Sequence, residues 1–181
     1  MAIPVVPSIA AILLRALTSA QGDPARTPRS LTLHYTSPPT AGPASIETRI
    51  ERTGRSLTTV SGRLLQAGKP CALALAAFST ERRGPEFSEA RMPEVAPPER
   101  CPAWEKRIEI HERYEQRWAI GAPPFSGGEH ALAGGWIRFP EARTLDSLAI
   151  AAFADAFPPA IFSRLGDAAL TGGVPTIDLT I

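Results

Sequence analysis

The strongest constraint on the fold is a set of four short runs with alternating apolar residues in the first half of the chain. This period of two is typical of strands with one buried face, because successive side chains of a strand point to opposite faces. Pro and Gly residues of hairpin-turn type separate the runs. We therefore expect an antiparallel meander over residues 30–36, 45–52, 56–66 and 70–78.

Helices are predicted on both sides of this region. Ser8 can cap a helix whose apolar residues recur at spacings of three and four as far as Ala20. Asp146 can cap a second helix, which Pro158 and Pro159 would kink or break. Further strands are expected at residues 107–120, 134–140 and 175–181.

The composition narrows both the architecture and the partners. The 181 residues include 19 Pro and 14 Gly, which disfavours a long helical bundle because each Pro removes a backbone donor. The 19 Lys and Arg residues nearly balance the 18 Asp and Glu residues, and the net charge of +1 gives no field to hold nucleic acid. No membrane partner is expected either, because no apolar run reaches the ~18 residues of a span.

The cysteines and the first residues bear on cofactors and location. Cys71 and Cys101 cannot form a disulfide scaffold, and neither has a second ligand at the short spacing of a zinc site. Cys71 lies in an alternating run and is interpreted as a small core residue. Residues 1–20 are a targeting candidate without a basic start, and Arg15 interrupts their apolar run. We expect a cytoplasmic protein without a metal or redox cofactor.

A weak internal repeat relates the two halves of the chain. Each half has an Ala-rich helix, a Gly/Pro turn and a strand, and the two strands contain Leu31-Thr32-Leu33 and Leu179-Thr180-Ile181. The first copy has strands after its helix and few residues before it, whereas the second has strands before its helix and one after it. The repeat predicts two copies of one unit, each incomplete.

Several segments resemble the acyl-CoA thioesterases of the thioesterase II type. Residues 52–78, RTGRSLTTVSGRLLQAGKPCALALAAF, resemble the long hairpin of that family. Residues 30–39 are similar to a family strand that leads to an aromatic residue and a Pro turn. Residues 153–159 and 175–178 resemble motifs of the second domain. The resemblance extends from about Ile9 to Ile181, apart from the Pro-rich segment.

This resemblance implies an α+β double hotdog fold, in which an antiparallel sheet wraps around a long central helix in each copy. It implies a first hotdog at residues 1–79 without its entry strands, a Pro-rich linker at residues 80–105, and a second hotdog at residues 106–181 without its final strands.

The resemblance also implies acyl-CoA as the substrate. In that family an Asp, a Thr and a Gln orient a water onto the thioester carbonyl. The match carries the Asp onto Asp155 and the Thr onto Thr176, whereas the Gln has no counterpart before Ile181. On the residues alone, Asp155 would be a surface carboxylate and Thr176 an ordinary strand residue.

Two functions are therefore carried forward. The first is hydrolysis of fatty acyl-CoA to a free acid and CoA by a water that Asp155 and Thr176 orient. The alternative is a catalytically inactive, truncated hotdog that binds acyl-CoA or serves in assembly.

The Arg-rich stretch from Arg49 to Arg63 is either the exposed face of two strands or a contact for CoA phosphates. A homo-oligomer is expected, because residues 176–181 would form a sheet edge and such edges pair with other chains.

Overall fold

The computed structural model describes residues 6–104, 112–166 and 174–181. These residues form two compact units. The first draws on residues 1–84, 145–155 and 175–181, and the second on residues 85–144 and 156–174. These units are defined by which residues pack together. The predicted division into a first hotdog at residues 1–79, a linker at residues 80–105 and a second hotdog at residues 106–181 is a different one, and it stays a prediction.

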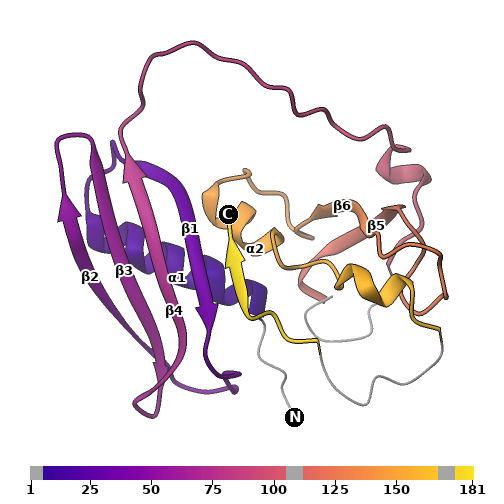
Figure 1. The fold of residues 1–181 in the computed structure, drawn as a ribbon, viewed down its shortest axis with the longest axis horizontal. Coiled ribbons are helices and arrows are strands. Elements are labelled where there is room, and N and C mark those ends of the chain that lie inside the picture. The colour runs from indigo at the N-terminus through magenta and orange to yellow at the C-terminus, as the bar shows by residue number, and fades with distance from the viewer. Residues whose placement is uncertain (1–5, 105–111, 167–173) are drawn as a thin grey trace. The chain divides into compact units, whose positions relative to one another are not determined.

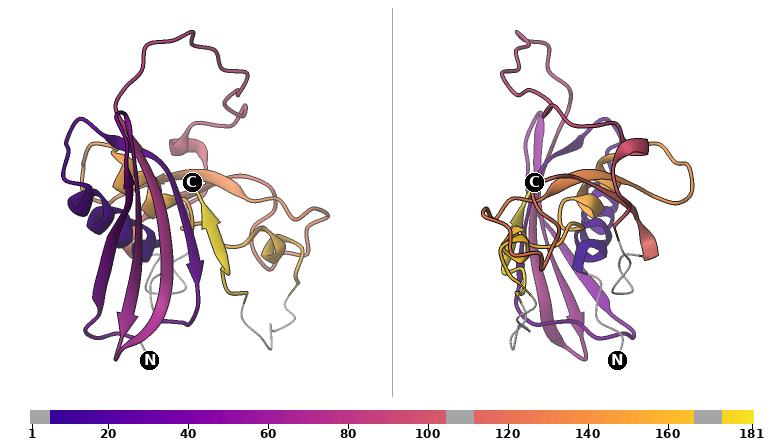
Figure 2. Two further views of the ribbon diagram at one scale, coloured as in Figure 1. Left: turned by 60° about the vertical axis from the view of Figure 1, so that its left-hand side comes forward. Right: turned by 90° about the vertical axis from the view of Figure 1, so that its right-hand side faces the viewer.

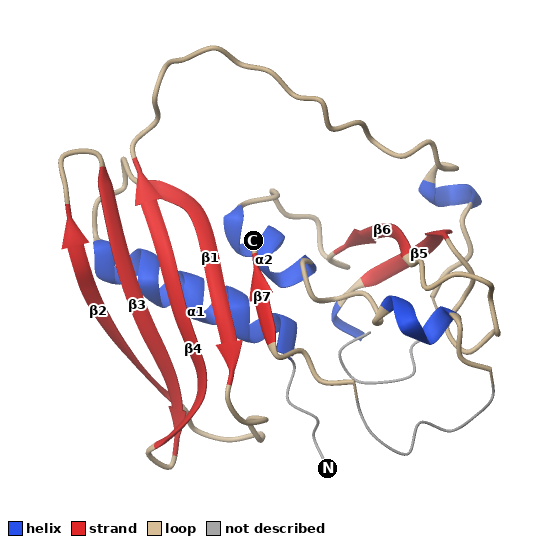
Figure 3. Cartoon of the chain, viewed as in Figure 1, coloured by secondary structure: helices blue, strands red, loops and turns tan. Residues whose placement is uncertain are grey.

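The first unit is an antiparallel sheet packed against a helix (Figures 1 and 2). Within the described residues the strand order is β2-β3-β4-β1-β7, and every neighbouring pair is antiparallel. The helix α2 completes the unit (Figure 3). The elements are α1 (Val6–Gln21), β1 (Thr27–Tyr35), β2 (Ser45–Thr53), β3 (Leu57–Gln66), β4 (Lys69–Ser79), α2 (Ser147–Phe153) and β7 (Asp178–Thr180).

Two sequence expectations about this unit were wrong. The strands do not form a meander in chain order, because β1 pairs with β4 and β7 instead of β2. Residues 36–44 hold three prolines and are longer than the common hairpin loops, so they connect two strands that are not neighbours. In addition, α1 begins at Val6, before the expected cap Ser8. Pro7 fits the first turn, where a helix has no partner for the missing N–H.

The core lies between α1 and the sheet. Leu13 and Leu17 of α1 are fully buried, as is Leu33 of β1. Gly62 of β3 allows the helix to approach, since a Cβ at this position would lie 2.8 Å from Leu17 Cδ2. Cys71 belongs to the core, as the sequence predicted. The buried residues of the sheet include Leu31, Val60, Leu64, Ala72, Ala74, Ala76 and Phe78.

The two repeated tripeptides are antiparallel neighbours. Thr32 pairs with Thr180 and Leu33 with Leu179. Leu31 and Ile181 exchange two backbone hydrogen bonds, each of 2.9 Å. The register places the Thr32–Thr180 pair at the centre, so a local twofold relation maps one tripeptide onto the other. The two tripeptides of the sequence repeat are therefore neighbours in the sheet, whereas the division into two copies stays a prediction.

The second unit contains a two-stranded antiparallel sheet of β5 (Glu115–Ile120) and β6 (Gly134–Arg138). The strand expected at residues 107–120 begins at Glu115 in its described part, and residues 105–111 lie outside the described residues. Trp118 is buried, and its ring centroid lies 5.4 Å from that of Trp104 and 6.0 Å from that of Phe157. The short helices are η1 (Pro98–Arg100) and η3 (Ala160–Ser163).

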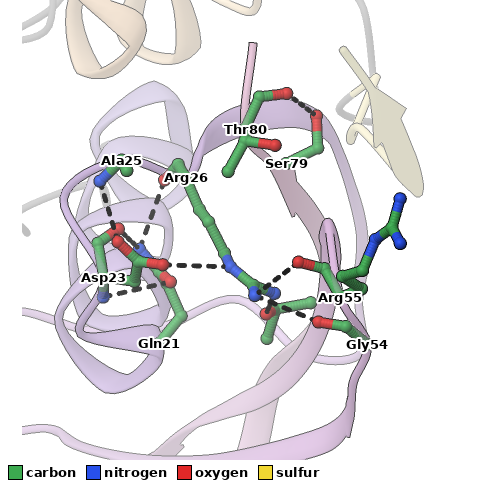
Figure 4. Close-up of polar contacts among 9 residues, drawn as sticks. Gln21, Asp23, Ala25, Arg26, Gly54, Arg55, Ser79 and Thr80 are labelled. Carbon is green, nitrogen blue, oxygen red and sulfur yellow. Dashed lines mark hydrogen bonds and ion pairs between the residues drawn. The ribbon is translucent and has the colours of Figure 1, made fainter. Parts of the chain in front are cut away.

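Arg26 ties the end of α1 to the β2–β3 turn (Figure 4). Its guanidinium donates to Asp23 Oδ2 at 3.1 Å, to Thr58 Oγ1 at 2.5 Å and to the carbonyl of Gly54 at 3.0 Å. Its side chain is 12% exposed. Because Thr58 is buried and hydrogen bonds to charged groups are strong, this network fixes the turn to the helix.

We predict that Arg26→Met lowers the free energy of unfolding by about 2–3 kcal/mol, since it removes charged hydrogen bonds but keeps the apolar stem. Urea unfolding followed by circular dichroism measures this change. Arg29→Met is the matched control, because Arg29 is exposed and donates to Ser79 Oγ at the sheet surface. Equal losses in the two variants would contradict the prediction.

Candidate functional site

Asp155 is positioned by the end of α2. Asp146 begins this helix, and its Oδ1 accepts a hydrogen bond of 2.7 Å from the Ala149 N–H. The cap agrees with the sequence prediction. The helix ends at Phe153, so Asp155 follows just beyond it and is half-buried. The turn toward Pro158 therefore carries the carboxylate off the helix surface on which the residues alone would place it.

Thr176 reaches this carboxylate from the segment before β7. The Tyr35 N–H donates to the Ile177 carbonyl at 2.9 Å, which fixes the chain next to Thr176. Thr176 Oγ1 lies 3.1 Å from both carboxylate oxygens of Asp155, and its single proton is shared between them. The two site residues expected from the sequence are thus brought together within the first unit.

The environment raises the pKa of Asp155 above its ordinary value. Burial is the larger cause because it disfavours the charged form, and the hydrogen bond from Thr176 opposes it. A carboxylate with a raised pKa is a stronger base than an exposed one. The pair therefore combines a strengthened proton acceptor with a hydroxyl that has lone pairs free to accept.

Tyr35 is a further candidate residue that sequence reasoning missed. Its hydroxyl oxygen is buried and has no hydrogen-bond partner among the described residues. The pKa of Tyr35 is raised, first by burial and then by the charge of Asp155. The alternation of β1 places its ring with Leu31 and Leu33, so the sequence indicated a core aromatic. The signal that could have identified Tyr35 was a polar hydroxyl on a strand face that is otherwise apolar.

Other features of the first unit lie apart from these three residues. A pocket of about 160 Å³ is lined mainly by apolar side chains, and Asp155, Thr176 and Tyr35 are not among them; its lining is Leu14, Pro28, Arg29, Ser30, Leu31, Ser147, Ile150, Ala151 and Ile181. In the Arg-rich stretch, Arg63 pairs with Glu47 at 2.7 Å and Arg49 with Glu51 at 3.3 Å. Both arginines are exposed, as expected. A role toward CoA phosphates stays a prediction.

We predict that Asp155→Asn raises the melting temperature at pH 7. Since folding raises the pKa of Asp155, its contribution to stability is fully present below the unfolded pKa of about 4 and is lost as the pH rises through the folded pKa. Asn removes the charge and can still accept from Thr176. The gap between the variant and the native chain therefore narrows toward pH 4 in thermal scans.

Asp178→Asn controls for net charge, because Asp178 is exposed on β7. A melting temperature of Asp155→Asn below that of the native chain at pH 7 would contradict the prediction.

Within the described residues, none of the helices has the length and apolar character needed to cross a membrane. A comparison with curated protein sequences gave no match.

Solved structures share the fold. A hot dog fold protein of unknown function from Alicyclobacillus acidocaldarius is 29% identical, with a TM-score of 0.77 over 95% of this chain and 64% of its own. A proposed thioesterase II from Thermobifida fusca is 23% identical, with a TM-score of 0.80 over 99% and 69%. An acyl-CoA thioesterase II from Mycobacterium marinum is 22% identical, with a TM-score of 0.65 over 84% and 61%. The chain thus spans less than two thirds of the first and third of these proteins.

These similarities confirm the α+β hotdog fold expected from the sequence. Two family domains match the sequence itself. The acyl-CoA thioesterase N-terminal domain matches residues 8–79, and the acyl-CoA thioesterase C-terminal domain matches residues 88–181. The chain belongs to the acyl-CoA thioesterase family.

Proposed function

We propose that the chain hydrolyses fatty acyl-CoA to a free acid and CoA, with Asp155 as the base that activates water and Thr176 as the hydroxyl that holds it. The observation that carries the proposal is the hydrogen bond between the Thr176 hydroxyl and both carboxylate oxygens of Asp155. The substrate class follows from the family, whose two domains match the chain in order.

The chemistry of the pair supports this reaction. A water can donate one proton to the Asp155 carboxylate and the other to Thr176 Oγ1, which turns its lone pair toward the thioester carbonyl. As the water oxygen forms its bond to the carbonyl carbon, Asp155 takes a proton and the carbonyl oxygen gains negative charge. The carbonyl then re-forms as the C–S bond breaks, which yields the acid, and the departing CoA thiolate takes the proton from Asp155.

The raised pKa of Asp155 fits this role. A general base works best when its pKa lies near the working pH, and the pKa of an exposed carboxylate lies well below neutral pH. Because the base must be ionised, the proposal requires activity to fall at acidic pH, with a midpoint raised above the ordinary pKa of an aspartate.

A second candidate function is a hotdog that binds acyl-CoA without turnover or serves in assembly. The observation that favours it concerns the third family residue. Asp155 and Thr176 are hydrogen-bonded to each other, and no glutamine is a partner of either among the described residues. Binding of a CoA ester by calorimetry without release of thiol would establish this second function in place of the first.

We predict that Asp155→Ala lowers kcat by about 10²–10⁴-fold, the usual contribution of a general base. Thr176→Val keeps the shape but removes the hydroxyl, so we expect a loss of about tenfold or more. Thiol released from a panel of acyl-CoA esters measures both changes. Thr180→Val is the matched control, because Thr180 is an exposed threonine on β7, the strand that follows Thr176. No turnover by the native chain above that of Asp155→Ala would refute the proposal.

We further predict that the chain is a homo-oligomer. Within the described residues β7 ends the sheet order and has β1 on one side. The N–H and C=O groups of such an edge favour pairing with another chain. Sedimentation velocity over a concentration series should show species larger than a monomer, and a single monomeric species at all concentrations would contradict this.

The cytoplasmic location expected from the sequence also stays a prediction.

A further inference from the structure

The geometry points to Tyr35 as a third catalytic residue, whose hydroxyl donates a hydrogen bond to the carbonyl oxygen of the thioester. This inference rests on the proposed hydrolysis and assigns the stabilisation of the developing oxyanion, which Asp155 and Thr176 cannot supply. A carboxylate has no proton to donate, and the hydroxyl proton of Thr176 is already engaged by Asp155.

The first step of the argument is position. Tyr35 is the last residue of β1, and its N–H bonds the carbonyl of Ile177, the neighbour of Thr176. The preceding pair in the register is His34 with Asp178. The strand pairing thus holds Tyr35 beside the segment that carries Thr176, within the same unit.

The second step is the state of the hydroxyl. The ring packs against the core, and the buried oxygen has no partner among the described residues. A buried hydroxyl without a partner destabilises the folded chain, and native structures contain few of them. Phe would fill the same volume without this cost. A hydroxyl kept at this cost is available to a ligand.

The third step is the protonation state. Burial and the negative charge of Asp155 both raise the pKa of Tyr35, so the phenol keeps its proton at neutral pH. His34, the nearest titratable residue along β1, is exposed on the opposite face of the strand. Tyr35 is therefore a neutral hydrogen-bond donor for the oxyanion, and the ionised Asp155 accepts the proton from water.

The test is Tyr35→Phe, which removes the hydroxyl oxygen and keeps the ring. We expect kcat for acyl-CoA hydrolysis to fall by about 10²-fold, the usual loss for one oxyanion donor, with KM within about twofold. The acidic limb of the pH–rate profile should stay in place, since Asp155 still sets it. Tyr114→Phe removes the other tyrosine hydroxyl of the chain, in the second unit, and should keep kcat within about twofold.

Two results would overturn the assignment while leaving the proposed hydrolysis intact. One is an unchanged kcat in Tyr35→Phe while Asp155→Ala is inactive. The other is a shift of the acidic limb with an unchanged plateau, which would make Tyr35 a positioning residue for Asp155. Absence of turnover by the native chain would instead overturn both proposals.

A spectroscopic measurement tests the same contact without turnover. Acyl-CoA labelled with ¹³C at the carbonyl is bound to Asp155→Asn, and its C=O stretch is recorded by infrared difference spectroscopy. A hydrogen bond from Tyr35 lowers this frequency, so adding Tyr35→Phe should raise it. An identical frequency in the single and double variants would overturn the donor assignment.

Discussion

The pairing of β1 with β7 is the interaction on which the rest of the first unit depends. It joins Leu31 to Ile181 and Thr32 to Thr180, from opposite ends of the chain. Closing so long a loop costs little more than closing a shorter one, since each doubling of loop length adds about 0.6 kcal/mol. Backbone hydrogen bonds and the burial of Leu33 offset that cost. Thr176 and Tyr35 come together through this pairing.

Local patterns predicted the elements well but not their neighbours. Alternation showed which face of β1, β3 and β4 is buried, and Asp146 marked the start of α2, because both features depend on residues close in sequence. The strand order was wrong because alternation does not say which strand lies next to which. The two copies of the tripeptide repeat do pair with each other, but a repeat by itself does not predict pairing.

The site was predictable to different extents for its three residues. Asp155 and Thr176 were found through the resemblance of their motifs, since nothing in a spacing of some twenty residues indicates contact. Tyr35 was not found, because its position with Leu31 and Leu33 on one face of β1 is explained fully by packing. Only the fold shows that the charge of Asp155 acts on this hydroxyl and raises the pKa of Tyr35.

Asp155 and Tyr35 share one energetic property, because each carries a polar group whose burial destabilises the folded chain. Burial raises the pKa of Asp155, so the ionised carboxylate is less stable in the folded chain than in the unfolded one. The unpartnered hydroxyl of Tyr35 adds a second cost at the same place. Asn and Phe would relieve both costs with almost no change of shape. Destabilising groups of this kind, each replaceable by a stable isostere, support the proposed catalytic roles of Asp155 and Tyr35.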